Sequence, residues 1–457
     1  MLEEIQALDD NHTWDLVNLP EGKKALRCKW VYTVKFDVDG SVARLKDILV
    51  AKEFAQTYGV DYSDTFFPMA KLTSVRFVAQ GEYGKVCHLK KSLYDLKQSP
   101  RAWFGKFSEV VQKFGLQKSK CDHSVFYRKS AAGVILLVVY VDDIVITGDD
   151  CTGSTSLKKF LQTKFHSKDL GQLKYFLGIE VSRSKKGIFL SQRKYVLDLL
   201  AETRTAGAKL CNTPMNPSVH LTKDDGDRFD DPEKYRRLVG KFNYLTVTRL
   251  DIAYAVSTVS QSMSEPTAKH WTALKHILCY LKGAPGLGLL YSNHGHSCIE
   301  CFSEADWAGS KLHRKSTTGY RVFVDGNLVS WKSKKQSVVS RSSTESEYRA
   351  MAQSTCEIMW ICHLLEEISL KPPLPAKLWR DNQATRYIAS NPVYHERTKH
   401  IEVDCHFIRE KIQENLISTS YVKTGEQLGD ILTKSLNGTR VEYLCNKLGM
   451  INIYAPA

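Results

Sequence analysis

The segment VILLVVYVDDIVITG, from Val134 to Gly148, constrains the fold of this chain more than any other. Two runs of apolar, largely β-branched residues flank the adjacent acids Asp142 and Asp143, a pattern that predicts a buried hairpin with acids at its turn. Such hairpins usually turn through Asn-Gly or Asp-Gly, and neighbouring carboxylates repel each other. Shared divalent cations would explain the pair, and two such cations can drive phosphoryl transfer. A solvated turn with incidental acids is the alternative, and it is the commoner case for an isolated pair.

Further segments follow one another in an order that resembles a single family. The motif YVDD between apolar strands resembles the catalytic hairpin of a reverse transcriptase. The segments VCHLKKSLYDLKQSPRAWFGKF and DLGQLKYFLGIEV on either side resemble those of Ty1/copia-type retrotransposon Pol polyproteins. The motifs SEADWAGS, STESEYRA, RDNQA and EQLGDILTK then resemble the ribonuclease H domain of these elements, in the same order. The resemblance extends over nearly the whole chain.

Length and charge agree with this resemblance. The 457 residues allow two or three domains with sizeable cores. A formal net charge of +14 suits a polyanionic partner, because neutralising phosphates releases counterions. A basic protein that is merely soluble would have the same composition, so charge alone does not decide.

Cysteine usage and the terminal sequence bear on the compartment. The 12 cysteines lack the spacing of a disulfide framework, and we expect Cys298 and Cys301 to be buried strand thiols rather than zinc ligands. The apolar run ending at Val141 is too short to span a bilayer, and the N-terminal sequence has no signal-peptide pattern. We therefore expect a cytoplasmic or nuclear protein that does not contact a membrane.

The expected fold class is mixed α/β (α+β), and the resemblance implies its domains. Residues 1–205 would form truncated right-hand polymerase fingers and palm, including a hairpin around DVDG and an amphipathic helix around RAWFGKFSEVVQKFG. Residues 206–295 would form a helical thumb or connection, ending at the glycine- and proline-rich KGAPGLGLLY. Residues 296–440 would form a ribonuclease H-like mixed sheet with helices, followed by a tail at 441–457.

Within 296–440 the pattern predicts strand, hairpin, helix, strand, helix, strand and helix. Asp325 and Gly326 form a strong turn signal, and Ser342 with Glu345 is a candidate capping box for a long helix. The segment KHIEVDCHFIREK contains histidines and a cysteine, but its apolar spacing favours an amphipathic helix over a metal site.

The resemblance implies a set of site residues. Ribonucleases H place acids around two magnesium or manganese ions, which activate water against a phosphodiester. The matching positions, together with the hairpin pair, make the catalytic and metal candidates Asp142, Asp143, Glu304, Glu347, Asp381 and Asp430. Candidates for holding nucleic acid through its backbone are Lys332, Lys334, Lys335, Gln336, Asn382, Gln383 and Lys399. Any one basic run is more often only a solvated face.

The sequence departs from the family at three points. SEADWAG replaces the usual SDADWAG, so Glu304 carries its oxygens about 1 Å further out, a displacement that can lower a rate roughly 100-fold. The family's third polymerase aspartate lies in a segment resembling LDVKNAFLHG, but here Arg76 runs directly into Phe77 and that segment is missing. Ile48 stands where the family usually has an arginine suited to gripping a triphosphate.

The leading hypothesis is therefore a retrotransposon-derived reverse transcriptase and ribonuclease H fragment. By family it is an RNA-directed DNA polymerase, but we expect polymerisation to be lost and hybrid cleavage to be weakened. Its partners would be an RNA/DNA hybrid or an RNA template with a DNA primer, and deoxynucleotides only if the polymerase works. A nucleic-acid-binding remnant without catalysis is the alternative. A third reading is a relic that folds poorly because a palm strand is missing.

Overall fold

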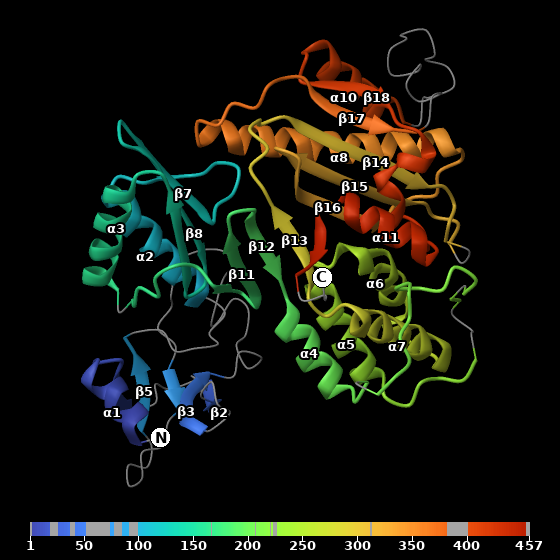
Figure 1. The fold of residues 1–457 in the computed structure, drawn as a ribbon. Coiled ribbons are helices and arrows are strands. Elements are labelled where there is room, and N and C mark those ends of the chain that lie inside the picture. Colours follow the sequence, from blue (N-terminus) through green and yellow to red (C-terminus); the bar gives the residue numbers. More distant parts are fainter. Residues whose placement is uncertain are drawn as a thin grey trace. The chain divides into compact units, whose positions relative to one another are not determined.

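The structure is a computed structural model that describes residues 2–18, 26–36, 42–51, 74–76, 85–90, 99–165, 167–205, 207–219, 221–222, 226–310, 313–381 and 401–453. The chain divides into two compact units, Met1–Asp169 and Leu170–Ala457, which are described one at a time (Figure 1). Helices and sheets occur in both units, which confirms the mixed fold class. The domain boundaries near 205, 295 and 440 stay predictions.

The first sheet of the N-terminal unit has the strand order β1-β5-β4-β2-β3. Helix α1 (Leu2–Asp10) precedes the strands, which are β1 (Trp14–Asn18), β2 (Leu26–Phe36), β3 (Val42–Ala51), β4 (Ser74–Arg76) and β5 (Lys85–Leu89). Strands β2 and β3 pair antiparallel, which confirms the predicted hairpin, although its turn lies outside the described residues. Leu49 and Leu89 are buried, with Leu8 and Trp14 packed against them.

The second sheet of this unit carries the Asp142–Asp143 hairpin. Its strands, in the order β6-β7-β8-β9, are β6 (Gln117–Lys118), β7 (Val125–Ser130), β8 (Gly133–Tyr140) and β9 (Asp143–Gly148). Helices α2 (Ser99–Lys113) and α3 (Cys151–Lys164) pack on it (Figure 1). Alternate residues of β8 enter the core with Phe107 of α2 and Leu157 of α3, as the strand period of two requires. The predicted helix and hairpin are both confirmed.

In the C-terminal unit one antiparallel sheet joins segments that lie far apart in the sequence. Its order is β10 (Tyr175–Phe176), β11 (Ile179–Ser184), β12 (Gly187–Ser191), β13 (Leu287–Tyr291) and β19 (Met450–Asn452). The segment expected to end a domain, KGAPGLGLLY, thus supplies β13. The residues expected to form a tail supply helix α11 (Gly438–Lys447) and β19.

The predicted helical region is confirmed. It contains α5 (Pro232–Leu245), α6 (Ala253–Val259) and α7 (Ala268–Gly283), with short 3₁₀ turns η2 (Leu250–Ile252) and η3 (Ser260–Ser262) beside α6. Helix α4 (Arg193–Glu202) precedes the predicted region and packs with these helices. Asp231 caps α5, because its side chain accepts a hydrogen bond from the Lys234 N–H at 2.9 Å, and Pro232 occupies the first helical position. Tyr235, Phe242 and Leu278 are among the buried residues that these helices share.

The third sheet has the order β16-β15-β14-β17-β18. Strand β14 (Ile299–Asp306) pairs antiparallel with β15 (Thr317–Val324) and parallel with β17 (Ala376–Arg380). Strand β16 (Asn327–Lys335) forms one edge and β18 (Ile417–Tyr421) the other. The remaining elements are α8 (Ser343–Glu367), α10 (Glu402–Gln413), η5 (Thr424–Glu426) and η6 (Leu428–Leu432). The order of elements predicted for residues 296–440 is confirmed, except that the last predicted helix is η6, a short 3₁₀ turn.

Helices cover both faces of this sheet. Val322 packs with α8 and α10, whereas its neighbour Phe323 packs with η6 and α11, because successive strand residues point to opposite faces. Ile401, Cys405 and Ile408 are buried, which confirms the predicted amphipathic helix. The turn at Asp325 and Gly326 is also confirmed, with φ of +51° and +67°, as a two-residue hairpin of this type requires.

The cluster of buried residues that contains Phe323 also reaches the helical region, since it includes Leu250 and Ala253 beside Leu428 and Leu432 of η6. The Trp331 indole N–H donates to the Thr246 carbonyl at 3.2 Å, which ties β16 to the same region. The helical region and the third sheet therefore share one core.

Two smaller predictions have different outcomes. Cys301 is buried as expected, but Cys298 is exposed because it precedes the first residue of β14, so that expectation was wrong. Across the described part of the chain, no helix is both long and apolar enough to cross a membrane.

Candidate acidic metal site

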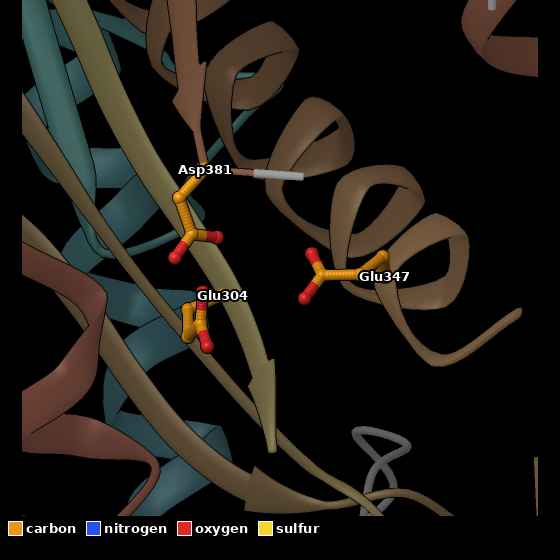
Figure 2. A group of neighbouring side chains, drawn as sticks. All are labelled: Glu304, Glu347 and Asp381. Atoms are coloured by element: carbon orange, nitrogen blue, oxygen red, sulfur yellow. The ribbon is translucent and has the colours of Figure 1, made fainter. Parts of the chain in front are cut away.

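Three predicted acids converge at one edge of the third sheet. Glu304 lies near the C-terminal end of β14, and Asp381 directly follows β17. These strands are parallel neighbours, with Phe302 opposite Trp379, so their ends meet at the same edge. Glu347 approaches from the first turns of α8, and one oxygen of each acid lies within 4.8 Å of the others (Figure 2).

The start of α8 sets the direction of its acids. The Ser342 hydroxyl accepts the Glu345 N–H at 3.2 Å, which confirms one half of the predicted capping box; the Glu345 side chain accepts the Arg341 N–H rather than that of Ser342. The Glu345 carboxylate accepts the Arg341 N–H at 2.6 Å and pairs with Arg349 at 3.0 Å, so it is used within the helix. Glu347 faces the sheet instead, and accepts the N–H of Ala305 at 3.3 Å.

Burial and like charge act together on these acids. Glu304 is 6% exposed and Glu347 is 5% exposed, and the Oε2 atom of each has no hydrogen-bond partner among the described residues. Burial, followed by the charges of Glu347 and Asp381, raises the pKa of Glu304. Burial, followed by the charge of Asp381, likewise raises the pKa of Glu347. Carboxylate oxygens without partners are what a hard divalent cation binds, so this group fits Mg²⁺ or Mn²⁺.

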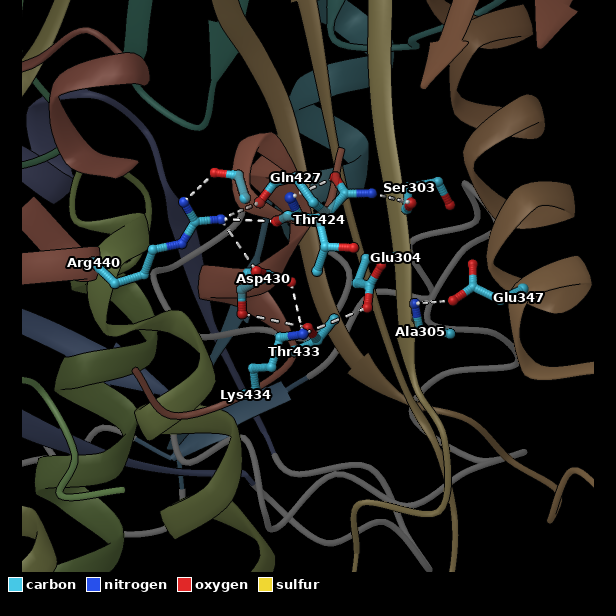
Figure 3. A network of polar contacts seen from close by, with 12 residues as sticks. Ser303, Glu304, Ala305, Glu347, Thr424, Gln427, Asp430, Thr433, Lys434 and Arg440 are labelled. Atoms are coloured by element: carbon cyan, nitrogen blue, oxygen red, sulfur yellow. Dashed lines mark hydrogen bonds and ion pairs between the residues drawn. The ribbon is translucent and has the colours of Figure 1, made fainter. Parts of the chain in front are cut away.

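The fourth predicted acid, Asp430, lies in η6 beside the basic side chains of Lys434 and Arg440 (Figure 3). Its Oδ1 is 2.8 Å from the Lys434 Nζ, and its Oδ2 is 3.2 Å from an Arg440 guanidinium nitrogen. The same Lys434 Nζ is 3.7 Å from the Glu304 Oε1. Burial alone would lower the pKa of Lys434, but its hydrogen bond with Asp430 and the charges of Asp430 and Glu304 raise it.

Close packing holds η6 against β14. The Gln427 side-chain amide donates to the Ser303 carbonyl at 3.2 Å, and its oxygen accepts the Gly429 N–H at 3.0 Å. A Cβ atom at Gly429 would lie 2.4 Å from the Glu304 Cβ, closer than any real contact, so only glycine allows this approach.

Sequence reasoning missed Lys434, Arg440, Gln427 and Gly429. One signal was available, because Lys434 stands four residues after Asp430 in the motif EQLGDILTK, and that spacing places two side chains of a helical segment together. Arg440 lies outside every motif.

The predicted nucleic-acid contacts fall into three groups. Lys332 and Lys334 are exposed on the edge strand β16, and their spacing puts them on one face. Lys335 is partly buried and donates to the Gln261 side-chain oxygen at 2.8 Å. Gln336 is 4% exposed, and its side-chain amide donates to the Thr318 hydroxyl and to the Ser346 carbonyl. These intramolecular hydrogen bonds occupy the amide that was predicted to contact nucleic acid. The others, Asn382, Gln383 and Lys399, lie outside the described residues.

The Asp142–Asp143 hairpin is a separate feature of the N-terminal unit. Strands β8 and β9 pair up to Tyr140 opposite Asp143, so Val141 and Asp142 make the turn and both aspartates are exposed. Val141 has φ +51°, an uncommon and costly conformation for a β-branched residue. Among the described residues only Glu304, Glu347 and Asp381 bring three metal-ligating atoms within 4.8 Å, so no third such group lies that close to the aspartate pair.

Comparison with known sequences gives matches along the chain. The family described as reverse transcriptase (RNA-dependent DNA polymerase) matches in two segments, residues 11–81 and 76–217. The retrovirus-related Pol polyprotein from transposon RE1 of Arabidopsis thaliana is 40% identical over 492 residues, covering 99% of this chain and 34% of the relative. The corresponding polyprotein from transposon TNT 1-94 of Nicotiana tabacum is 34% identical, covering 98% and 37%. The chain thus spans about a third of the length of these relatives.

Similarity to solved structures is distant. LC11-RNase H1, isolated from compost, aligns with a TM-score of 0.24 and 12% identity, over 34% of this chain and 96% of that one. A foamy viral protease-reverse transcriptase dRH in complex with double-stranded DNA aligns with a TM-score of 0.21 and 14% identity, over 94% of this chain and 70% of that one.

Proposed function

The chain belongs to the family of retrovirus-related Pol polyproteins of Ty1/copia-type transposons, and on that premise we propose that its C-terminal unit is a metal-dependent ribonuclease H. Its substrate would be the RNA strand of an RNA/DNA hybrid. The observation that carries the proposal is the convergence of Glu304, Glu347 and Asp381 within 4.8 Å, on two parallel strand ends and one capped helix.

These three acids would hold Mg²⁺ or Mn²⁺, which when bound supplies activation of water and stabilisation of charge on the phosphate. The chain's own residues prepare that position. The N–H of Ala305 fixes Glu347, and the packing of Gly429 fixes the base of the Glu304 side chain. The exposed Lys332 and Lys334 offer charges for the phosphates of the hybrid backbone.

In our proposal, the glutamate at position 304, where the family usually has aspartate, weakens the nuclease activity without abolishing it. The longer side chain still brings an oxygen within 4.8 Å of the other two acids, so the cation ligands converge. Its contact with Lys434 at 3.7 Å holds the carboxylate on the side of η6. A displacement of about 1 Å from the best position is expected to lower the rate roughly 100-fold.

Polymerase activity, by contrast, is lost in this proposal. Asp142 and Asp143 are exposed, and no third metal-ligating group of the described residues lies within 4.8 Å of both. Two observations support a gap near Arg76. The family match consists of two segments that overlap at residues 76–81. The alignment with the RE1 polyprotein runs over 492 positions, more than the 457 residues of this chain. Purified chain should therefore add no deoxynucleotides to a primed RNA template.

A nucleic-acid-binding protein without catalysis is the second candidate. The observation that favours it is the pair of exposed lysines, Lys332 and Lys334, on one face of an edge strand. Backbone contacts of this kind recognise the shape of a hybrid and need no metal.

Cleavage of a labelled RNA/DNA hybrid by the purified full chain, with Mg²⁺ or Mn²⁺, distinguishes the two. The test variant is Asp381→Asn, and the matched control is Glu442→Gln, which removes an exposed acid on α11. A nuclease requires cleavage that Asp381→Asn loses and Glu442→Gln keeps. Tight hybrid binding without any metal-dependent cleavage would favour the binding protein.

A further inference from the structure

We propose that Lys434 takes the place of a second divalent cation, so that the acidic site holds one Mg²⁺ or Mn²⁺ between Glu304, Glu347 and Asp381. This inference rests on the proposed nuclease function and specifies its metal requirement. A site with two cations needs a carboxylate that bridges them and a further acid on the far side. Glu304 and Asp430 are the residues available for that second position.

The gap between those two acids is already occupied. The Lys434 Nζ lies 2.8 Å from the Asp430 Oδ1 and 3.7 Å from the Glu304 Oε1. A Mg²⁺ ion shared by both acids would have to approach one oxygen of each to about 2.1 Å, in the same space. The ammonium group and a second cation therefore exclude each other while Lys434 stays in this position.

The charges around Asp430 also support a single cation at the site. Asp430 is paired with both Lys434 and Arg440, so its negative charge is already balanced (Figure 3). The Glu304 Oε1 faces Lys434, whereas its Oε2 has no hydrogen-bond partner among the described residues. The side of the site with oxygens left to bind a cation is therefore the side of Glu347 and Asp381.

The two acids that face Lys434 are buried, whereas the Lys434 side chain itself is 38% exposed. The Lys434 backbone N–H donates to the Asp430 carbonyl at 3.1 Å, one turn earlier in the chain. Arg440, which grips Asp430, also donates to the carbonyls of Thr424, Gly425 and Gln427. The backbone of Lys434 and the guanidinium of Arg440 are thus positioned beside Asp430 by hydrogen bonds with the main chain.

A lysine and a cation do not have the same chemistry. The ammonium group supplies one positive charge and three hydrogen-bond donors, suited to a phosphate oxygen or a developing negative charge. It does not activate water as a bound metal does. Lys434 would therefore supply only positive charge and hydrogen bonds, and the activation of water would be left to the single cation that Glu304, Glu347 and Asp381 would hold.

Counting bound Mn²⁺ by electron paramagnetic resonance tests this inference. The full chain would carry Asp142→Asn and Asp143→Asn throughout, so that the hairpin does not contribute, and sites lost in Glu304→Gln would be counted as belonging to the acidic site. We expect one such ion with Lys434, one with Lys434→Arg and two with Lys434→Met. The two ions of Lys434→Met should show magnetic coupling, since they would lie about 4 Å apart.

The outcomes separate the inference from the function on which it rests. Two coupled ions with Lys434 present would overturn the inference, as would a single ion in Lys434→Met. One ion that supports no hybrid cleavage would keep the inference and reject the nuclease. No ion at the site, together with no cleavage, would reject both. Lys434→Arg keeps the positive charge, so it is the matched control in which one ion is still expected, and the urea unfolding midpoint of Lys434→Met shows whether that variant folds.

Discussion

Replacement of the buried Arg321 should raise the stability of the C-terminal unit. It lies on β15 between Tyr320 and Val322 and is fully buried, with Nε, Nη1 and Nη2 lacking hydrogen-bond partners among the described residues. Burial lowers the pKa of Arg321 to about 9, against the favourable charge of Asp430. Asp430 is itself balanced by Lys434 and Arg440, so it compensates Arg321 only in part.

The expected effect of Arg321→Met follows from these contacts. A buried polar group without partners costs about 1–3 kcal/mol, and replacing buried charges by apolar side chains of similar size has stabilised proteins by about 1–4 kcal/mol. Methionine keeps the length of the side chain and removes the charge. We therefore expect the free energy of unfolding to rise by about 1–4 kcal/mol, which moves the urea midpoint up by about 0.3–1.3 M for a slope near 3 kcal/mol per M.

Pulse proteolysis of the full chain at increasing urea concentration would measure that midpoint for the C-terminal unit. Arg321→Lys is the control, since it keeps a buried charge and should give no gain. A lower midpoint in Arg321→Met would refute the reasoning, because it would mean that the guanidinium makes favourable polar contacts in the folded protein.

Three further results are expected. Without divalent cations, thermal stability should fall as the pH rises from about 5 to 9. The pKa of Glu304 is raised from 4.5 to about 9, so in this range the folded state keeps a proton that the unfolded chain releases. The stabilisation that is present at low pH is therefore lost as the pH rises through the pKa of the folded state. Added Mn²⁺ should flatten that dependence in a thermal-shift series, and a profile that stays flat without metal would contradict the burial argument. Gly429→Ala should lower the free energy of unfolding by about 1–3 kcal/mol and slow hybrid cleavage, because its Cβ would lie 2.4 Å from the Glu304 Cβ. The control is Gly425→Ala, whose Cβ would have no atom within 4 Å and which should behave as wild type in urea unfolding and cleavage. Ser342→Ala should lower the free energy of unfolding, measured with urea, by about 1 kcal/mol because it removes the cap of α8. The control is Ser343→Ala at the exposed neighbouring position, which should have no effect. Equal losses in both variants would argue against capping.

Local patterns predicted the elements of the fold well. The hairpin around Asp142, the helix beginning after Ser342 and the helix containing Cys405 all follow from periodicity or capping signals that act within a few residues. The pairing of β13 with β19 could not be predicted in the same way. It joins short segments whose neighbours in space are set by the packing of everything between them.

In the acidic site, too, some residues could be predicted from local sequence patterns and others could not. Glu304, Glu347 and Asp381 were identified by the order of their motifs, and they do converge. The pairing of Asp430 with Arg440 was not foreseen, because an ion pair across ten residues leaves no periodic pattern. The pairing with Lys434, four residues away, could have been predicted from spacing. The buried Arg321 was missed for the opposite reason: on a strand it reads as an ordinary solvent-facing residue, and only tertiary packing encloses it.

The core that α6 shares with η6 has a consequence for how the molecule opens. Leu250 and Ala253 pack in one cluster with Leu428 and Leu432, which flank the segment bearing Asp430. Elements that share a core tend to open as one cooperative unit, so their backbone amides should exchange hydrogen with deuterated solvent at matching rates. A cation bound by the acids would then slow exchange in the helical region as well, and damage to α6 would reach the acidic site as a loss of metal affinity without touching a ligand.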